Sequence, residues 1–384
     1  MWIEETRWNS ARGWHSQSAA RNASADLVMY FGNRDVLRGG QRYAELRSAY
    51  PGADIVGCSA TGSITNDTID DHGIVAVALG FARTPIRVAH HQVTQQSESR
   101  AAGESVGAAL VSDDLAGVFV FADGLRVDGS SLVAGLSAII GEGPLVVGGM
   151  ASDPREYAEA LVGANCAPCS GMVAAIGFYG NAIRMGHGHA NGWDAFGPRR
   201  RITRSSGNVL YDLDGKPAIE LYQRYLGDEI GSSISWDGVR LPLTISPPEH
   251  PEQVLVRAPL AVDDGPASMT FAGHMPEGWI ARLMRGNADR LILGAGDAAR
   301  LARIDGAGDS RGDRLGFIVS CAGRQQLMGQ RTEEELEIAG IELGSDVKRI
   351  GFYSYGEIGP IAHAARSELH NETMIIASLM EAEI

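Results

Sequence analysis

The sequence predicts an α/β to α+β fold with mixed sheets, because the same order of secondary-structure signals occurs three times along the chain. Each copy contains a β-rich apolar run, an amphipathic helical stretch, a second apolar run, a Gly-containing turn and a closing apolar run. A strand–helix–strand of this length favours a parallel pair joined by a right-handed crossover, beside which the last strand returns antiparallel. We therefore expect three strand–helix–strand–turn–strand units, together with a β-rich insertion.

The elements of each copy follow in order. The first strands are expected in LVMYFGNRD from Leu27, GVFVFADGL from Gly117 and LGFIVSCAGR from Leu315. The helices are expected at 41–49, 130–140 and 332–343, the last with the capping-box spacing of Thr332 and Glu335. The second strands and turns are ADIVGCSATGSI, LVVGGMASDP and RIGFYSYGEIGP, and the closing strands are GIVAVALGF, GMVAAIGFYG and ETMIIASLM. Because ligands collect at the carboxyl ends of parallel strands, the turns are the expected binding region.

The segment 185–312 has a different composition and is expected to be the β-rich insertion. It contains the Pro-rich stretch LPLTISPPEHPEQ and short β-like runs such as VLVRAPL, with helices expected at 218–226 and 279–285. The chain is too long for one ordinary core, so we expect two domains, at 1–184 and at 185–384, the second including the insertion.

Composition excludes several classes of function. Lys+Arg 33 against Asp+Glu 47 gives a formal net charge of −14, which repels nucleic acid and anionic lipid. The apolar runs are strand-sized and the start does not resemble a secretory signal, so a cytoplasmic location without membrane contact is expected. Cys166 and Cys169 form a C-x-x-C, which suits a redox pair or half of a metal site, although ordinary reduced thiols are the simpler expectation.

The ordered motifs YDLDGKPAIELY, SCAGR, the Glu333–Glu335 triplet, GFYSYGEIGP and LHNETM resemble the FIST C domain. GCSATGSI and GIVAVALGF are similar to the FIST N domain, so the resemblance to this family of sensory domains covers nearly the whole chain. The first-half turn of the family usually reads GCSTAGEI, whereas Ser63 stands here where an acid would be expected. Glu357 is the matching acid of the second half.

The resemblance implies a non-catalytic sensor that binds a small metabolite, such as an amino acid or a derivative, between its two halves. It implies that the protein regulates a separate histidine kinase or cyclic-di-GMP enzyme in trans. The oligomeric state is left open, and a homodimer is one alternative. No G-x-S-x-G elbow, Walker P-loop or H-E-x-x-H occurs, although an enzyme with an unrecognised site is an alternative.

The candidate ligand-binding residues lie in the turns. Glycines let backbone N–H groups approach a ligand, hydroxyls orient polar molecules, and Arg324 can pair with a carboxylate or phosphate. The alternatives are turn formation for the glycines and, for Arg324, a buried ion pair with Glu357 or with one of Glu333 to Glu335. The predicted set is Gly57, Cys58, Ser59, Thr61, Gly62, Gly149, Ser320, Cys321, Arg324, Tyr355, Gly356 and Glu357.

Some stand-alone proteins that the chain resembles are haem-based nitric oxide sensors, so haem b is the alternative cofactor. One neutral imidazole would then be the axial ligand. The candidates are His189, His274 and His187, of which His189 is preferred because it lies at the expected boundary between the halves. A structural or surface role is the alternative for each of them.

Overall fold

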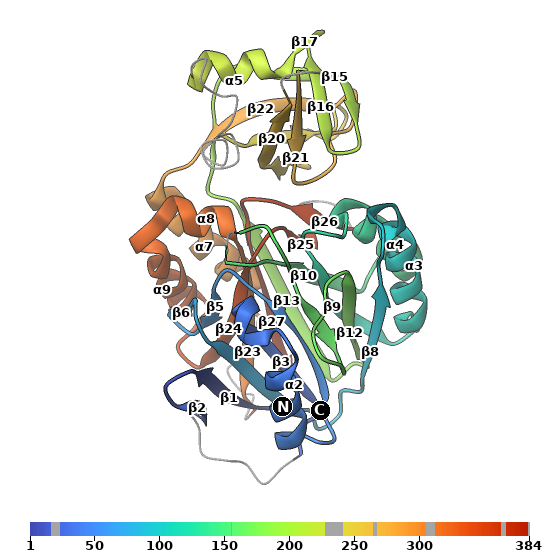
Figure 1. The fold of residues 1–384 in the computed structure, drawn as a ribbon, viewed down its shortest axis with the longest axis vertical. Coiled ribbons are helices and arrows are strands. Elements are labelled where there is room, and N and C mark those ends of the chain that lie inside the picture. Colours follow the sequence, from blue (N-terminus) through green and yellow to red (C-terminus); the bar gives the residue numbers. More distant parts are fainter. Residues whose placement is uncertain are drawn as a thin grey trace.

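The structure is a computed structural model and describes residues 1–16, 24–154, 156–226, 241–263, 267–304, 312–361 and 366–382. Within these residues, three six-stranded sheets form a core and a further set of strands forms the insertion, which stands above the core in Figure 1. None of the helices in the described part of the chain is long and apolar enough to cross a bilayer.

The first sheet contains the first repeat. β3 (Leu27–Gly32) and β4 (Asp54–Ser59) are parallel and are joined through α1 (Arg34–Leu37) and α2 (Gln41–Ala49). β7 (Ile74–Gly80) returns antiparallel to β3, and β1 (Trp2–Asn9) and β2 (Gly13–Ser16) extend the sheet beyond it.

The second repeat has the same design. β9 (Leu115–Asp123) and β10 (Leu145–Ala151) are parallel and flank α4 (Gly129–Ile140), and β12 (Met172–Tyr179) returns antiparallel to β9. β8 (Ile86–Gln92) pairs with β12, and η1 (Gln96–Glu98) and α3 (Ser99–Leu110) follow β8. α3 and α4 lie on the outer face of this sheet (Figure 1). Their apolar side chains form one buried cluster with those of its strands.

The third repeat completes the core. β23 (Arg314–Cys321) and β24 (Val347–Ser354) are parallel and are connected by α8 (Ala322–Met328), η5 (Gly329–Arg331) and α9 (Thr332–Leu343). β27 (Met374–Glu381) returns antiparallel to β23, and β13 (Ile183–Ala190) pairs with β27. α7 (Ala288–Ala302) packs with α9 over this sheet. The predicted α/β fold with three repeats is therefore confirmed.

Each repeat contributes a strand to the sheet of another repeat. β5 (Ser63–Thr65), followed by β6 (Thr68–Asp70), pairs with β24 of the third repeat. β11 (Val162–Ala164) of the second repeat pairs with β4 of the first, and β25 (Glu357–Pro360), followed by β26 (Ser367–His370), pairs with β10 of the second. This cyclic exchange links the three sheets, so the two sequence halves interlock.

One glycine recurs at the same place in all three repeats. Gly57, Gly148 and Gly351 face Tyr30, Val120 and Ile318 across the parallel strand pair. A Cβ at any of them would collide with the carbonyl oxygen of the residue that it faces. Close approach of the strands is therefore sufficient to explain Gly57, and its role in ligand binding stays a prediction.

The inner faces of the sheets share one apolar core. Phe31 of the first sheet stacks on Phe352 of the third at 4.9 Å, and Phe119 of the second stacks on Phe317 of the third at 4.7 Å between ring centroids. All four rings are buried. Such burial of large aromatic side chains is the main favourable term that holds the three sheets together.

The insertion begins after β13 and ends before α7. Its strands are β14 (Asp194–Ala195), β15 (Arg200–Ser206), β16 (Val209–Leu213), β17 (Lys216–Pro217), β18 (Leu243–Ser246), β19 (Leu255–Arg257), β20 (Pro259–Asp263), β21 (Ser268–Phe271) and β22 (Ile280–Arg285). The helix expected at 218–226 is α5 (Ala218–Leu226). The helix expected at 279–285 was wrong, because this segment is β22, whose backbone pairs with β18. α7 and most of β13 fall within the expected 185–312 insertion, but both belong to the core.

Candidate functional site

The Gly-rich turns of the three repeats meet at the centre of the core. Ser59 Oγ donates to Ser152 O at 2.6 Å, Ser152 Oγ donates to Tyr353 O at 2.6 Å, and Tyr353 N donates to Gly62 O at 2.9 Å. Ser59, Ser152 and Tyr353 are fully buried. We call Ser59, Thr61, Gly62, Ser152 and Tyr353 the turn hub. Its polar groups satisfy one another, which is what a structural junction requires.

Several predicted site residues belong to this junction. Ser59, Thr61 and Gly62 are hub residues, and Gly57 and Cys58 precede them on β4. Cys58 is fully buried, and burial raises the pKa of its thiol. Gly149 on β10 lies against Val319, where a Cβ would be 2.7 Å from the side chain.

Arg324 occupies a second buried cluster, in which every side chain is paired. Its Nη2 lies 2.8 Å from Glu335 Oε2, and its guanidinium also donates to the carbonyls of Asn191 and Leu291. Ser320 Oγ and Tyr353 OH each donate to Glu335 Oε1 at 2.9 Å. Arg324 and Glu335 are fully buried, so this geometry favours the ion-pair alternative for Arg324.

A cavity of about 130 Å³ lies between the second and third repeats, beneath the insertion. The turns that follow β9 and β24 and the start of α8 form its floor, and residues around β20 and β21 of the insertion contribute to its wall. We call it the turn pocket. Its lining residues are Gly124, Leu125, Tyr157, Ala258, Leu260, Ala272, Cys321, Ala322, Gly323, Gln326, Ser354, Tyr355, Asn371 and Glu372. Cys321 and Tyr355 of the predicted set are among them.

Glu372 is the distinctive residue of the turn pocket. Its side chain is buried, and among the described residues Oε2 has no hydrogen-bond partner. Burial raises the pKa of this carboxyl from 4.5 to about 8. The backbone at Glu372 has a φ of +54°, a conformation that costs energy for a residue with a side chain and that is concentrated at functional sites.

A second carboxyl, Glu357, lies next to this pocket. Ser354 Oγ donates to its Oε1 at 2.6 Å, and Thr373 N donates to its Oε2 at 3.2 Å. Burial raises the pKa of Glu357, and the neighbouring Glu372 adds to the effect. Burial also raises the pKa of the Cys321 thiol, with Glu357 and Glu372 contributing, so this thiol is a poor nucleophile.

The aromatic wall of the turn pocket consists of two tyrosines. Tyr157 and Tyr355 stack with 5.0 Å between ring centroids. Tyr355 OH donates to Asp153 Oδ1 at 2.5 Å, and Arg34 Nη1 binds Asp153 Oδ2 at 3.1 Å. Gly356, which follows, packs against Leu369 and Met150.

Glu372 is also tied to the connection between core and insertion. Trp193, between β13 and β14, donates from Nε1 to Glu372 O at 3.0 Å. Arg257 of the insertion donates from Nη1 to Leu369 O at 2.9 Å, near the start of the same turn. The backbone of the turn that carries Glu372 is therefore hydrogen-bonded both to the segment that precedes the insertion and to the insertion itself.

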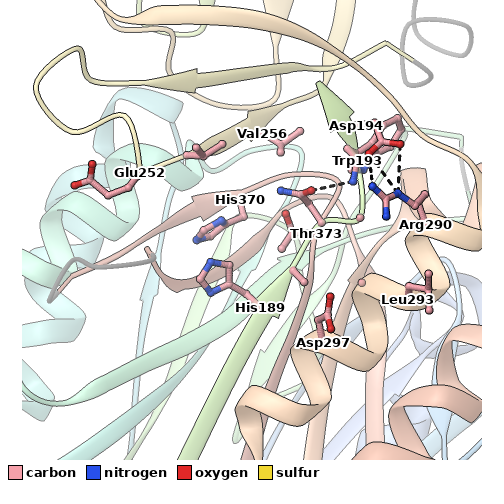
Figure 2. A pocket seen from close by; sticks show the side chains of 15 residues that line it. His189, Trp193, Asp194, Glu252, Val256, Arg290, Leu293, Asp297, His370 and Thr373 are labelled. Carbon is pink, nitrogen blue, oxygen red and sulfur yellow. Dashed lines mark hydrogen bonds and ion pairs between the residues drawn. The ribbon is translucent and has the colours of Figure 1, made fainter. Parts of the chain in front are cut away.

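The preferred histidine lies in a different cavity of about 400 Å³, shown in Figure 2. His189 on β13 and His370 on β26 line it with ring centroids 5.1 Å apart, and Trp193, Val256 and Leu293 contribute apolar surface. We call it the histidine cavity. Burial lowers the pKa of His370 to about 3 and also lowers that of His189, so both imidazoles are neutral near pH 7.

The structure separates the three predicted haem histidines. His187 and His189 both line a neighbouring groove of about 690 Å³ along β13. His274 instead pairs through Nε2 with Asp128 Oδ2 at 2.9 Å. Within the described ranges, no group of three or more His, Cys, Asp or Glu side chains is placed to hold a metal ion. Burial lowers the pKa of both His187 and His189, so both imidazoles are neutral near pH 7. Of the two, His189 lines both the groove and the histidine cavity, which keeps it the preferred candidate for the single axial imidazole that haem would need.

These observations define a three-repeat α/β protein in which the turn pocket and the histidine cavity lie where an inserted β-sheet meets the core. A FIST N domain model matches residues 26–216 and a FIST C domain model matches residues 218–360. The chain belongs to the FIST family, whose domains are generally sensory domains of signalling proteins.

Other comparisons add little. The crystal structure of cyanuric acid hydrolase from A. caulinodans matches with a TM-score of 0.34 and 11% identity, covering 94% of this chain and 91% of that chain. No curated protein matches the sequence significantly.

Sequence reasoning missed most of the turn pocket. Glu372 and Asn371 lie in the LHNETM motif, which carries the family resemblance, but neither is among the predicted site residues. Tyr157, Gln326 and the insertion residues carried no local signal. For the predicted residues outside the pocket, a role in ligand binding stays a prediction.

Proposed function

We propose that the protein is a cytoplasmic sensory protein whose small-molecule site is the turn pocket, and that it regulates a histidine kinase or a cyclic-di-GMP enzyme in trans. The observation that carries the proposal is the unpaired Oε2 of Glu372 in this pocket. A buried carboxyl without a partner is costly, and a ligand that supplies one recovers that cost.

The ligand is an amine-bearing metabolite, such as an amino acid or a derivative. Glu372 would receive the ammonium group, and the faces of Tyr157 and Tyr355 favour a cation. Ser354 and Asn371, on the same lining, offer a hydroxyl and an amide for the other end of the molecule. A cavity of about 130 Å³ suits a small metabolite rather than a nucleotide.

The effect of ligand binding would be transmitted to the signalling partner through the insertion. The Trp193–Glu372 hydrogen bond connects the pocket to the segment between β13 and β14. A ligand that prefers one position of the Glu372 turn shifts the population of insertion orientations by its difference in affinity for the two states. The signalling partner would bind one orientation of the insertion more tightly than the other.

The test is binding of amino acids and biogenic amines, measured by thermal shift and calorimetry on wild-type protein and on E372Q. We expect E372Q to remain folded and to bind the amine at least about tenfold more weakly, because a charge-assisted contact is lost. E368Q, on neighbouring β26, is the matched control and should bind normally. Unchanged affinity of E372Q would exclude the turn pocket as the amine site.

The pH dependence of binding supplies a second check. Glu372 is protonated below about pH 8 in the free protein, and a ligand ammonium favours the ionised form. Binding therefore releases a proton, and affinity for the amine should rise with pH up to about 8. E372Q should lack this rise.

A second candidate function is a haem-based nitric oxide sensor, favoured by the neutral His189 between two cavities. When bound, haem would supply an iron that binds nitric oxide, and His189 would supply the axial nitrogen. A Soret band in protein from haem-replete cells, lost in H189A and retained in H187A, would support it. Protein that stays colourless after haem titration would reject it and leave the turn pocket proposal untouched.

A further inference from the structure

The C-x-x-C motif lies in a short loop that the ligand proposal does not use. Val162 of β11 and Cys169 exchange two backbone hydrogen bonds, from Val162 N to Cys169 O at 3.0 Å and from Cys169 N to Val162 O at 2.9 Å. Cys166 lies inside the loop that this bridge closes, and Cys169 lies at its base. Both thiols are free and half-buried.

The loop is held in one conformation from outside. Asn165 has a φ of +55°. Its Nδ2 donates to Asp54 Oδ1 at 2.7 Å, and its Oδ1 accepts from Ile55 N at 2.8 Å. Gly163, two residues earlier on the same arm, lies against the hydroxyl of Tyr30 and close to Cys166 O. The two cysteines pack against the same apolar core, and both interact electrostatically with Tyr30.

We propose that Cys166 and Cys169 form a reversible disulfide and are a site of oxidation by low-molecular-weight disulfides such as oxidised glutathione. The two half-buried thiols are three positions apart in one loop that a backbone bridge closes, and they interact electrostatically with each other, which brings them near enough for exchange.

The exchange proceeds in two balanced steps. The Cys166 thiolate attacks one sulfur of the small disulfide, forms a mixed disulfide and releases one small thiolate. The Cys169 thiolate then attacks Cys166 Sγ, forms the intramolecular bond and releases the second small thiolate, while the two protein protons pass to the thiolates or to water. Cys169 acts second because burial raises the pKa of its thiol, with Cys166 and Asp123 contributing. Its Sγ also donates to Gln92 Oε1 at 3.5 Å.

Asp123 connects the cysteine loop to the turn pocket through hydrogen bonds. Gly171 N, two residues after Cys169, donates to Asp123 Oδ2 at 2.6 Å. Asp123 Oδ1 accepts from Leu125 N at 2.8 Å and from Arg126 N at 3.1 Å, and Leu125 lines the pocket. Oxidation is therefore expected to change amide protection at 124–126. Only its effect on ligand affinity rests on the function proposed above.

The experiment treats the folded full chain with oxidised glutathione and maps disulfides by peptide mass spectrometry without reduction. Wild-type protein should give a 166–169 disulfide and no lasting adduct, and dithiothreitol should reverse it. C169S should retain one glutathione on Cys166, because the resolving thiol is missing. C58S is the matched control, since Cys58 lies opposite Val162 on β4, and it should behave as wild type.

Three results would overturn the proposal: a stable glutathione adduct on wild-type protein, no reaction at all, or a bond from either loop cysteine to Cys58. Hydrogen exchange at 124–126 before and after oxidation tests the path to the pocket without any ligand. Unchanged exchange there, with the disulfide formed, would remove the regulatory consequence and keep the modification site.

Discussion

Two buried polar clusters at the end of β23 differ in one respect. Glu335 accepts hydrogen bonds from Arg324, Ser320 and Tyr353 on both of its oxygens. Glu372 has a carboxyl oxygen that no described residue pairs with. Both carboxyls are buried in the same repeat, so burial alone does not distinguish structure from function. The difference teaches that complete pairing, and not burial, is what separates a stabilising cluster from the proposed ligand site.

The largest loss of stability should come from removing the cation of the fully paired Glu335 cluster. Arg324→Met leaves Glu335 buried without its cation, which should lower the free energy of unfolding by about 3 to 5 kcal/mol. Arg38→Met, which removes a partly exposed pair with Glu159, is the control and should cost no more than about 1 kcal/mol. Urea unfolding followed by circular dichroism measures both. Equal losses would mean that the Arg324 cluster is not the structural one.

A smaller effect concerns the pH dependence of stability at the unpaired carboxyl. Folding raises the pKa of Glu372 from 4.5 to about 8, so the native state binds more protons than the unfolded state between these values. Its contribution to stability is fully present below pH 4.5 and is lost as the pH rises to about 8. E372Q cannot ionise, so its stability relative to wild type should increase across this window. Parallel curves for the two proteins would show that Glu372 has a partner outside the contacts described.

The smallest effect on stability is expected from the aromatic wall. Tyr157 is 45% exposed, so Tyr157→Ala should cost no more than about 1 kcal/mol while weakening amine binding several-fold. Tyr225→Ala is a matched control, because Tyr225 is 43% exposed and its ring packs against Phe196 in the insertion. It should lose similar stability and no affinity. A binding loss in both variants would place the effect outside the turn pocket.

Much of the architecture could be predicted because its signals are local. The strands predicted from Leu27, Gly117 and Leu315 correspond to β3, β9 and β23. The helices predicted at 41–49 and 332–343 are also present. The segment 279–285 was mistaken for a helix because six or seven residues hold too little periodicity to separate the two states. Backbone pairing with β18, which is far away in the sequence, makes this segment a strand.

The site was predicted only in part, because residue type does not reveal which polar groups find partners. Ser59 and Tyr355 looked equivalent in their turns, yet Ser59 is enclosed in the turn hub and Tyr355 lines a cavity. Among the acids proposed for Arg324, hydrogen-bond geometry selected Glu335 over Glu357.

The sequence by itself determined the three repeats and the family, since these depend on local periodicity and motif order. The carboxyl ends of the strands stay a prediction as the binding region. Only the tertiary structure decided the cyclic exchange of β5, β11 and β25 and the placing of the insertion over Glu372. Both depend on contacts between residues far apart along the chain, whose free energy is set by burial and by the partners available there.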